Sequence, residues 1–344
     1  MMPSPEDQVQ FLLKIQRLLG EGLFSATYKY ALLMALADLS VELGNDSGAA
    51  LDMNAESIAE KFIEYYWRQT LPYLGKDPLQ QNKGKSPVVV THLLDVRKSY
   101  GDQIAAAKRD RQRWPQVVRS IADNIRTMPL RYLQNVGGEA LPFLYDPPNG
   151  KAPRTIRLYP GVAFCLRRFH GLVSELVQAA WTRWIREQNL PIIGEVADLH
   201  EFLFGAKRAS LLLLQRPLRD LQSDLCFYCR RQMRTQSEVD HFIPWVLYQL
   251  DLGHNFVLAH RECNSAKRDR LASEMHLAGW IARNEASGAV LREEFDRLGV
   301  PHNLDSTNCI ARWAYSSTSS IGGRAWQAQD ILLPLTDKWR GLLD

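Results

Sequence analysis

Hydrophobic residues recur at helical spacing along most of the chain, and this pattern predicts a mainly α-helical fold. Near the N-terminus, Ser4 followed by Pro5 and two acidic residues is typical of a helix start, because the hydroxyl caps the first turn and proline fits its first position. Residues 26–43 are apolar on nearly every side, which predicts a buried helix that ends at Gly44. Asn54 is expected to cap a third helix.

The same kind of pattern predicts further helices and a few strands in the rest of the chain. Pro217 is expected to interrupt a pair of helices, because proline lacks a backbone donor. The serine-rich stretch 316–323 is expected to be a flexible loop. The other predicted helices cover 88–131 (two or more helices), 161–188, 196–221, 272–284 and about 290–298, and the predicted short strands cover 142–145 and 155–159.

Between residues 225 and 271 the pattern changes to two short strands followed by a helix. Glu238–His241 is typical of the end of one strand, and Asn255–Ala259 is a second, apolar strand that we expect to be antiparallel to the first. Neighbouring residues 240 and 241 then point to opposite faces, or lie at a bend. A helix is expected from Arg261 onward, so the segment is predicted to be a ββα unit.

The length and composition of the chain favour a multidomain, water-soluble protein. Its 344 residues exceed one typical domain, and 46% of them are hydrophobic, enough for a large core. We expect a helical domain at 1–205, the ββα domain at 206–275 and a helical C-terminal extension at 276–344. The N-terminus has no pattern of a signal peptide, and the longest apolar run is too short to cross a bilayer. We therefore expect a cytoplasmic protein with no membrane association.

Two ligand pairs with matched spacing lie in the ββα segment. Cys226 and Cys229 form one pair, and His260 and Cys263 form a second pair with the same gap. Four such ligands complete a tetrahedral Zn²⁺ site and leave no position for water, so the predicted zinc is structural. The five cysteines are an odd number, which argues against a disulfide framework and for a reducing compartment. The alternative is a group of ordinary buried thiols.

A second group of side chains in the segment offers oxygen ligands beside a histidine. Asp240 and Asn264 carry the oxygens that Mg²⁺ prefers, and His241 has a pKa range suited to a general base. Lys267 shares a helix face with Asn264 and is a candidate contact for a phosphate oxygen. Phosphodiester hydrolysis needs an activated water and charge stabilisation, so this set predicts a hydrolytic centre with one catalytic divalent cation, Mg²⁺ or Mn²⁺.

At these residues the segment resembles the HNH endonucleases, which belong to the ββα-metal group. The resemblance rests on Cys226, Cys229, the run Asp240-His241-x-x-Pro244, Asn255 before an apolar run, Cys263-Asn264 and Lys267. It implies that His241 is the general base and that Asp240 and Asn264 bind the cation. It also implies that Asn255 fixes the loop and orients His241, and that cleavage leaves a 5′-phosphate and a 3′-hydroxyl. One departure is His260, because zinc-bearing members usually have cysteine there.

A basic stretch in the helical region is a candidate surface for a phosphate backbone. Arginine and lysine outnumber acids there, with Trp114 and Tyr132 interleaved. The alternative is an ordinary solvated helix face, and the net charge of +4 does not decide between the two. The predicted nucleic-acid-binding residues of the whole chain are Lys108, Arg109, Arg111, Arg113, Arg230, Arg231 and Lys267.

Two hypotheses from different functional classes follow. The first is a single-metal endonuclease that cleaves DNA, with RNA as the alternative substrate because the site residues do not distinguish the two sugars. The second is a non-catalytic zinc module that binds nucleic acid or protein in a larger assembly. By analogy, a small nuclease fused to a large helical region is typical of a prokaryotic restriction or anti-phage defence effector. Such an effector would be controlled by a regulatory protein partner or by homo-oligomerisation.

Overall fold

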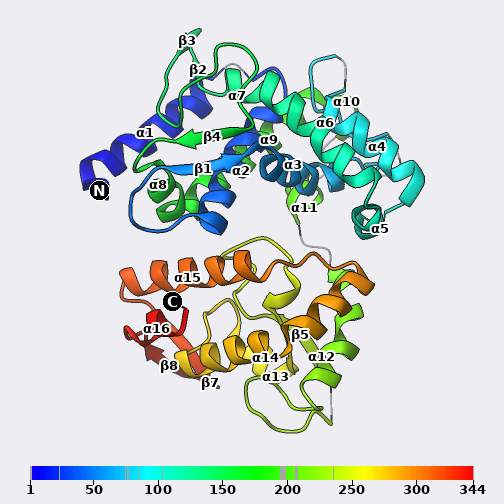
Figure 1. Ribbon diagram of the computed structural model, residues 1–344, viewed down its shortest axis with the longest axis vertical. Coiled ribbons are helices and arrows are strands. Elements are labelled where there is room, and N and C mark those ends of the chain that lie inside the picture. The colour runs from blue at the N-terminus through cyan, green and yellow to red at the C-terminus, as the bar shows by residue number, and fades with distance from the viewer. Residues whose placement is uncertain are drawn as a thin grey trace. The chain divides into compact units, whose positions relative to one another are not determined.

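The computed structural model of the protein describes residues 2–22, 24–73, 75, 77–84, 86–102, 104–193, 199–205, 208–234 and 236–343. The chain divides into two compact units, Met1–Gly205 and Ala206–Asp344 (Figure 1). The first unit is largely helical, and the second contains the ββα element with more helices after it. The predicted fold class is therefore confirmed. No helix in the described ranges is long and apolar enough to cross a membrane.

The first unit is built from helices and two small antiparallel strand pairs. Its helices are α1 (Pro5–Glu21), α2 (Tyr28–Leu43), α3 (Ala55–Gln69), α4 (Val88–Tyr100), α5 (Ile104–Arg109), α6 (Arg113–Thr127), α7 (Pro129–Tyr132), α8 (Val162–Arg168), α9 (His170–Gln188), α10 (Leu190–Ile193) and α11 (Leu199–Phe204). Its strands are β1 (Leu51–Asn54) paired with β4 (Thr155–Leu158), and β2 (Asn135–Val136) paired with β3 (Glu139–Ala140).

The apolar helix α2 is the central element of this unit. It packs against α3, α8 and α9, and most of its residues are buried (Figure 1). It ends before Gly44, as the sequence predicts. A helix that is hydrophobic all round is stable only when it is buried in this way.

Two helix caps also follow the sequence prediction. The Ser4 hydroxyl accepts a hydrogen bond from the Asp7 amide at 3.1 Å, and the Asp7 carboxylate reaches back to Ser4. The Asn54 side chain accepts from the Ser57 amide at 2.6 Å at the start of α3. Each bond satisfies a helix donor that would otherwise have no partner.

Replacing Asn54 by alanine is expected to lower the free energy of unfolding of the first unit by about 1 kcal/mol, because the first turn of α3 loses its cap. Replacement by aspartate keeps an acceptor at the same place and should restore most of that loss. Chemical denaturation of both variants measures the difference. Equal stability of the alanine variant and the wild type would contradict the prediction.

The predicted long helix at 161–188 is two helices, α8 and α9, and this part of the prediction is wrong. Phe169 leaves the helical conformation between them, with φ −111° and ψ 21°. On one side of the break, Arg167 donates to the Asp46 carboxylate at 2.9 Å. On the other side, His170 bonds Asp38 of α2 at 2.7 Å. Both sides of the break are thus held by polar contacts with distant parts of the chain.

The strand predictions for the first unit are partly wrong. Residues 155–158 form β4, but residues 142–145 form no strand and make only the single bridge between Tyr145 and Leu158. The true partner of β4 is β1, whose four residues precede the Asn54-capped helix. Leu51–Asn54 does alternate apolar and polar residues, but Asn54 is also the cap of the next helix, and the sequence there was interpreted only as a helix start.

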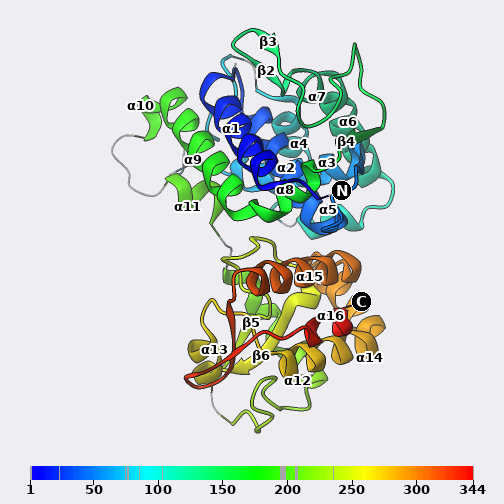
Figure 2. The same ribbon diagram turned by 90° about the vertical axis from the view of Figure 1, so that its left-hand side faces the viewer.

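The second unit surrounds a two-stranded sheet. Its helices are η1 (Arg208–Leu214), α12 (Gln215–Leu221), η2 (Gly253–Asn255), α13 (Arg261–Lys267), α14 (Glu274–Leu298), α15 (Leu304–Ser320) and α16 (Lys338–Leu343). Its strands are β5 (Ser237–His241) paired with β6 (Phe256–His260), and β7 (Arg324–Ala328) paired with β8 (Ile331–Pro334). Figure 2 shows β5 and β6 in the middle of this unit, with α13 at one end.

Several predicted elements of the second unit differ from those observed. One continuous helix, α14, replaces the two predicted after residue 271, and the predicted domain boundary between 275 and 276 falls inside it. Residues 316–320 are helical rather than a flexible loop. Pro217 lies in the first turn of α12 and does not interrupt it. In the predicted helical region 196–221, residues 196–198 and 206–207 lie outside the described residues. The three-domain division stays a prediction.

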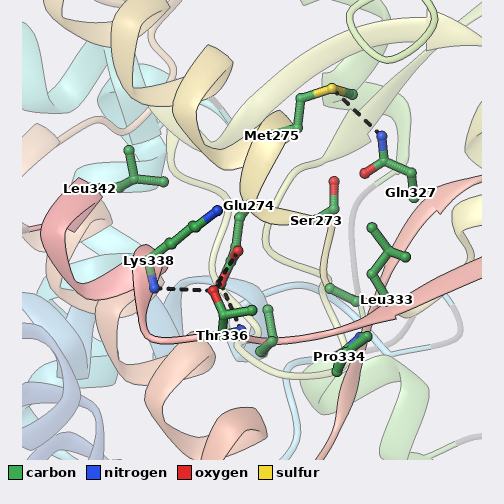
Figure 3. Close-up of a pocket in the computed structure, with 11 residues that line it drawn as sticks. Ser273, Glu274, Met275, Gln327, Leu333, Pro334, Thr336, Lys338 and Leu342 are labelled. Atoms are coloured by element: carbon green, nitrogen blue, oxygen red, sulfur yellow. Dashed lines mark hydrogen bonds between the residues drawn. The ribbon is translucent and has the colours of Figure 1, made fainter.

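A surface pocket of about 520 Å³ lies between the start of α14, the β7–β8 hairpin and α16 (Figure 3). In it the Glu274 carboxylate accepts hydrogen bonds from the Thr336 amide and hydroxyl at 2.8 and 2.9 Å. Most of the lining is apolar, and none of the sequence-predicted site residues belongs to it. The pocket is therefore distinct from the candidate site described below.

Candidate functional site

The β5–β6 hairpin and the helix α13 bring the predicted site residues into one part of the second unit. The strands are antiparallel with His241 opposite Phe256 and Ser237 opposite His260. Phe256 to Ala259 are fully buried, as expected of an apolar strand in a core. The chain enters α13 directly from β6, so the ββα prediction is confirmed.

The predicted zinc ligands converge at the base of this hairpin. The ligand atoms of Cys226, Cys229, His260 and Cys263 all lie within 4.8 Å of one another. The Cys229 Sγ and His260 Nδ1 atoms are 3.3 Å apart. Zn–S and Zn–N bonds of about 2.3 and 2.0 Å place tetrahedral ligands roughly 3.5 Å apart, so this donor set fits a Zn²⁺ ion.

Hydrogen bonds from the backbone around Cys226 favour the thiolate form of its sulfur. The chain turns tightly after it, with Cys226 N donating to Arg231 O at 2.9 Å and Arg230 at a φ of 59°. The Cys226 sulfur accepts from the His260 amide at 3.3 Å. The Cys263 thiol and the backbone amides that donate to this sulfur lower the pKa of Cys226 to about 4. A thiolate is the form that binds zinc.

The protein is expected to hold one zinc per chain, and replacing Cys226 by serine should abolish that binding because the ion loses a thiolate ligand. Metal analysis of the purified protein gives the stoichiometry. Cys309→Ser is the matched control, since Cys309 lies in α15 outside the ligand cluster. Full zinc content in the Cys226 variant would remove this residue from the ligand set.

The Asp240 carboxylate is buried and held by two donors on one oxygen. Its Oδ2 atom accepts from the Tyr228 hydroxyl at 2.5 Å and lies 3.0 Å from the Lys267 ammonium. Burial and the nearby carboxylate raise the pKa of Tyr228, so this hydroxyl remains a proton donor. The Asp240 Oδ1 atom accepts no hydrogen bond from any residue that the structure describes. One oxygen is thus fixed by two donors, and the other accepts none in the described part of the chain.

Asn264 lies on the face of α13 that packs against β5. Its Nδ2 atom donates to the Glu238 carboxylate at 2.9 Å. Glu238 and Asp240 are two residues apart in β5 and therefore share a face of the strand. The bond orients the Asn264 amide, and its Oδ1 atom accepts no hydrogen bond from the described part of the chain.

His241 follows Asp240 and is held by different partners. Its Nε2 atom bonds the Asp251 carboxylate at 2.7 Å, and the two side chains are 14% and 27% exposed. Its ring lies against Phe256, with centroids 4.9 Å apart, and against Trp245 at 5.4 Å. Within the described residues, no hydrogen bond joins this ring to Asp240 or Asn264.

Asn255 is hydrogen-bonded to the two residues that follow His241. Its side chain accepts from the Ile243 amide at 2.7 Å and donates to the Ile243 carbonyl at 2.9 Å. Its own carbonyl accepts from the Phe242 amide at 2.8 Å. These three bonds fix the segment that leaves β5 directly after His241.

Lys267 is placed differently from the expectation of a phosphate contact. It is fully buried, and its ammonium bonds the His241 carbonyl at 2.8 Å as well as Asp240. In this arrangement the ammonium does not reach solvent, where a phosphate would lie. Its position indicates instead a brace between α13 and the end of β5.

His254, the residue before Asn255, is buried. It is 2% exposed and packs against the rings of Phe295 and His302. Burial is the main cause that lowers its pKa to about 4, so the ring is neutral at physiological pH. The buried, neutral ring is therefore part of the packing beside Asn255.

Helix α14 holds the loop in front of β6 from outside the hairpin. The Trp280 indole donates to the His254 carbonyl at 3.0 Å, and Arg283 donates to the same carbonyl at 2.7 Å. Arg283 also reaches the Phe256 carbonyl at 2.5 Å. Burial lowers the pKa of Arg283 to about 9, which still leaves it protonated at neutral pH. From the other side, Gln222 bonds both the amide and the carbonyl of Leu258 at 2.8 Å.

Two of the predicted nucleic-acid-binding residues of the first unit, Lys108 and Arg113, lie close to carboxylates. Lys108 lies 4.0 Å from Glu64 and over the Trp114 ring, and Arg113 pairs with Asp95 at 2.9 Å. Arg109 and Arg111 are exposed on the same stretch. In the second unit, Arg230 and Arg231 are exposed on the turn beside the zinc ligands.

Two residues at the site were not among those predicted from the sequence. Asp251 and Tyr228 contact His241 and Asp240 from positions 10 and 12 residues away. Tyr228 lies inside the C-x2-C pair, which drew attention only to its cysteines. Asp251 is an acid in a loop, and no local spacing links it to His241.

Two family models match the chain. One is a domain of unknown function (DUF8808), which matches residues 8–192, and the other is the HNH endonuclease model, which matches residues 226–270. The chain belongs to the DUF8808 family and carries an HNH domain. No curated protein and no solved structure matches it.

The HNH domain contains the predicted zinc ligands and the residues that surround His241. The resemblance inferred from the motif is therefore confirmed, and the activity of the family is of the nuclease type, which implies binding of nucleic acid. The DUF8808 match lies within the first unit. The helices that follow residue 270, including α14, lie outside both matches.

Proposed function

We propose that the protein is a metal-dependent HNH endonuclease that hydrolyses phosphodiester bonds of DNA. The observation that supports this most is the state of the oxygens on Asp240 and Asn264. Each side chain is oriented by hydrogen bonds through one atom, and in each the remaining oxygen accepts none from the described residues. Oriented oxygen donors of this kind suit Mg²⁺ or Mn²⁺, which bind few protein ligands and retain water.

In this proposal His241 is the general base and takes a proton from the attacking water. Asp240 and Asn264 hold the cation, and Asn255 keeps the segment after His241 in place. When bound, the cation stabilises negative charge on the phosphate. We assign no phosphate contact to Lys267, because its buried ammonium is already bonded to Asp240 and to the His241 carbonyl.

We propose that the exposed arginines supply the contacts with the nucleic-acid backbone. Arg230 and Arg231 are exposed beside the hairpin, and Arg111 is exposed in the first unit. Lys108 and Arg113 pair with carboxylates, which reduces the charge they present. The basic stretch is therefore a weaker phosphate surface than its sequence predicts.

The test is nicking of supercoiled plasmid by the zinc-loaded protein with Mg²⁺ or Mn²⁺, with single-stranded and double-stranded RNA assayed in parallel. We expect cleavage of DNA and 5′-phosphate ends. Cleavage of RNA alone would replace the proposed substrate. Tight DNA binding without any cleavage would favour the non-catalytic zinc module.

A role in restriction or anti-phage defence is the biological setting that we propose for this activity. It is supported by the combination of a small nuclease domain with a large helical unit. Phage plaque counts on bacteria that express the wild type or a His241→Ala variant test it. Protection by the wild type alone is the expected result. Control by a regulatory partner or by homo-oligomerisation stays a prediction.

A further inference from the structure

The bond between His241 and Asp251 determines which nitrogen of the imidazole ring can act. A carboxylate only accepts hydrogen bonds, so the His241 Nε2 atom, 2.7 Å from Asp251 Oδ1, carries the hydrogen. In a neutral ring the second nitrogen, Nδ1, then holds the lone pair. Only this atom is able to accept a proton.

The ring is also prevented from turning over to exchange its two nitrogens. Phe256 stands opposite His241 in the sheet, with ring centroids 4.9 Å apart and planes at 62°. The Trp245 ring packs against a second side of the His241 ring, with centroids 5.4 Å apart. A rotated ring would lose the hydrogen bond to Asp251. Because only 14% of the His241 side chain is exposed, water does not fully replace that bond.

Asp251 is itself held in place by the loop that carries it. The next residues are fixed on two sides, because Gly253 N donates to Pro301 O at 2.8 Å and Asn255 N donates to Leu252 O at 2.9 Å. A Cβ atom at Gly253 would lie 2.6 Å from the Phe295 ring, so the backbone packs directly on α14 there. The carboxylate is thus presented by a supported loop.

We infer that Asp251 is a positioning residue that holds His241 in the Nε2–H tautomer and leaves Nδ1 as the atom that accepts the water proton. This inference rests on the proposed function. The water proton moves to Nδ1, and the water oxygen forms a bond to phosphorus. The bond from phosphorus to the 3′-oxygen breaks, and that oxygen keeps the electron pair and takes a proton from solvent. The imidazolium formed carries a positive charge directly beside the Asp251 carboxylate, which stabilises it.

The tautomer can be measured without any substrate. In zinc-loaded protein with ¹⁵N-labelled histidine, studied at mildly alkaline pH, the nitrogen shifts and couplings of His241 should report hydrogen on Nε2. In Asp251→Ala the same signals should move toward a mixture of both tautomers. Hydrogen on Nδ1 in the wild type would overturn the inference, whatever the enzyme cleaves.

Kinetics give the second readout. Asp251→Asn removes the charge with little change in shape, and we expect kcat to fall about 10- to 100-fold with KM and zinc content unchanged. Asp296→Asn is the matched control, because Asp296 also bonds a histidine, His302, at 3.1 Å, and should leave kcat unchanged. Unchanged kcat in the Asp251 variant, or an equal loss in the control, would contradict the inference.

The two readouts separate this inference from the proposed function. If the wild type cleaves nucleic acid and His241→Ala does not, but Asp251→Asn behaves as wild type, the function stands and the role of Asp251 is wrong. If the wild type cleaves nothing, the proposed function fails, and the tautomer measurement alone decides whether Asp251 fixes the ring. Thermal unfolding of each variant shows that its fold is retained.

Discussion

Replacing His241 by alanine is expected to lower the rate of DNA cleavage by about 10²- to 10⁴-fold, the contribution typical of a positioned general base. The physical reason is that the attacking water then has no base of suitable strength to take its proton. The described groups nearest to the ring do not supply another one. Asp251 loses its partner in this variant and cannot replace it, because a carboxylate is the weaker base. Initial rates of plasmid nicking at saturating Mg²⁺ measure the effect.

The matched control for this variant is His302→Ala in the same unit. His302 is largely buried and bonds an acid, as His241 does, but its neighbours are Asp296, His254 and Phe295 rather than site residues. It should keep at least most of the wild-type rate. Zinc content and circular dichroism should be unchanged in both variants. A His241 variant that nicks as fast as the wild type would exclude His241 as the base.

Replacing Trp280 by alanine is expected to lower the free energy of unfolding of the second unit by about 3–5 kcal/mol. The side chain is fully buried and stacks on Phe242, with ring centroids 5.0 Å apart and planes at 9°. Removing the indole opens a cavity against Phe242, the residue that follows His241. It also removes one hydrogen-bond donor to the His254 carbonyl. Urea denaturation of zinc-loaded protein measures the change.

Two further variants show which part of that loss comes from which interaction. Trp280→Phe keeps most of the stacking but lacks the indole donor, so it should lose less than the alanine variant. Met275→Ala in the same helix changes an exposed side chain and should stay within about 0.5 kcal/mol of the wild type. Independent unfolding of α14, with the hairpin still intact in the alanine variant, would show that the helix is not part of the same cooperative unit.

The sequence predicted the site best where chemistry depends on short spacing. The two ligand pairs 226/229 and 260/263 required only a turn and a strand-to-helix junction, which local sequence specifies. The roles of Asn255 and His241 follow from a motif and stay predictions. The caps at Ser4 and Asn54 were predicted for the same reason, since a cap depends on residues within one turn.

The errors occurred where distant contacts decided the outcome. The serines of 316–320 are helical because α15 buries Ile310, Trp313 and Ala314 on its apolar face, and serine is only mildly unfavourable in a helix. The break at Phe169 is set by partners of α8 and α9 in or near α2. A local pattern does not contain such partners.

The same limit applies to the residues missed at the site. Asp251 is joined to His241 by folding of the loop between β5 and β6, and Tyr228 meets Asp240 only because the C-x2-C turn packs beside β5. The basic stretch around residue 111 shows a related limit, because charge counted along the chain ignores the acids that folding brings near. Lys108 and Arg113 are the clearest cases.

The residues that hydrogen-bond β6 and the loop before it determine how long a fragment of this chain must be if it is moved into another protein. Gln222 holds Leu258 from before the HNH match, and Trp280 and Arg283 hold the carbonyls of His254 and Phe256 from after it. Pro301 anchors the backbone beside Asp251. A chimera that contained only the matched residues 226–270 would keep every predicted zinc ligand and lose these hydrogen bonds. The smallest donor fragment for engineering therefore begins before Gln222 and extends beyond Pro301.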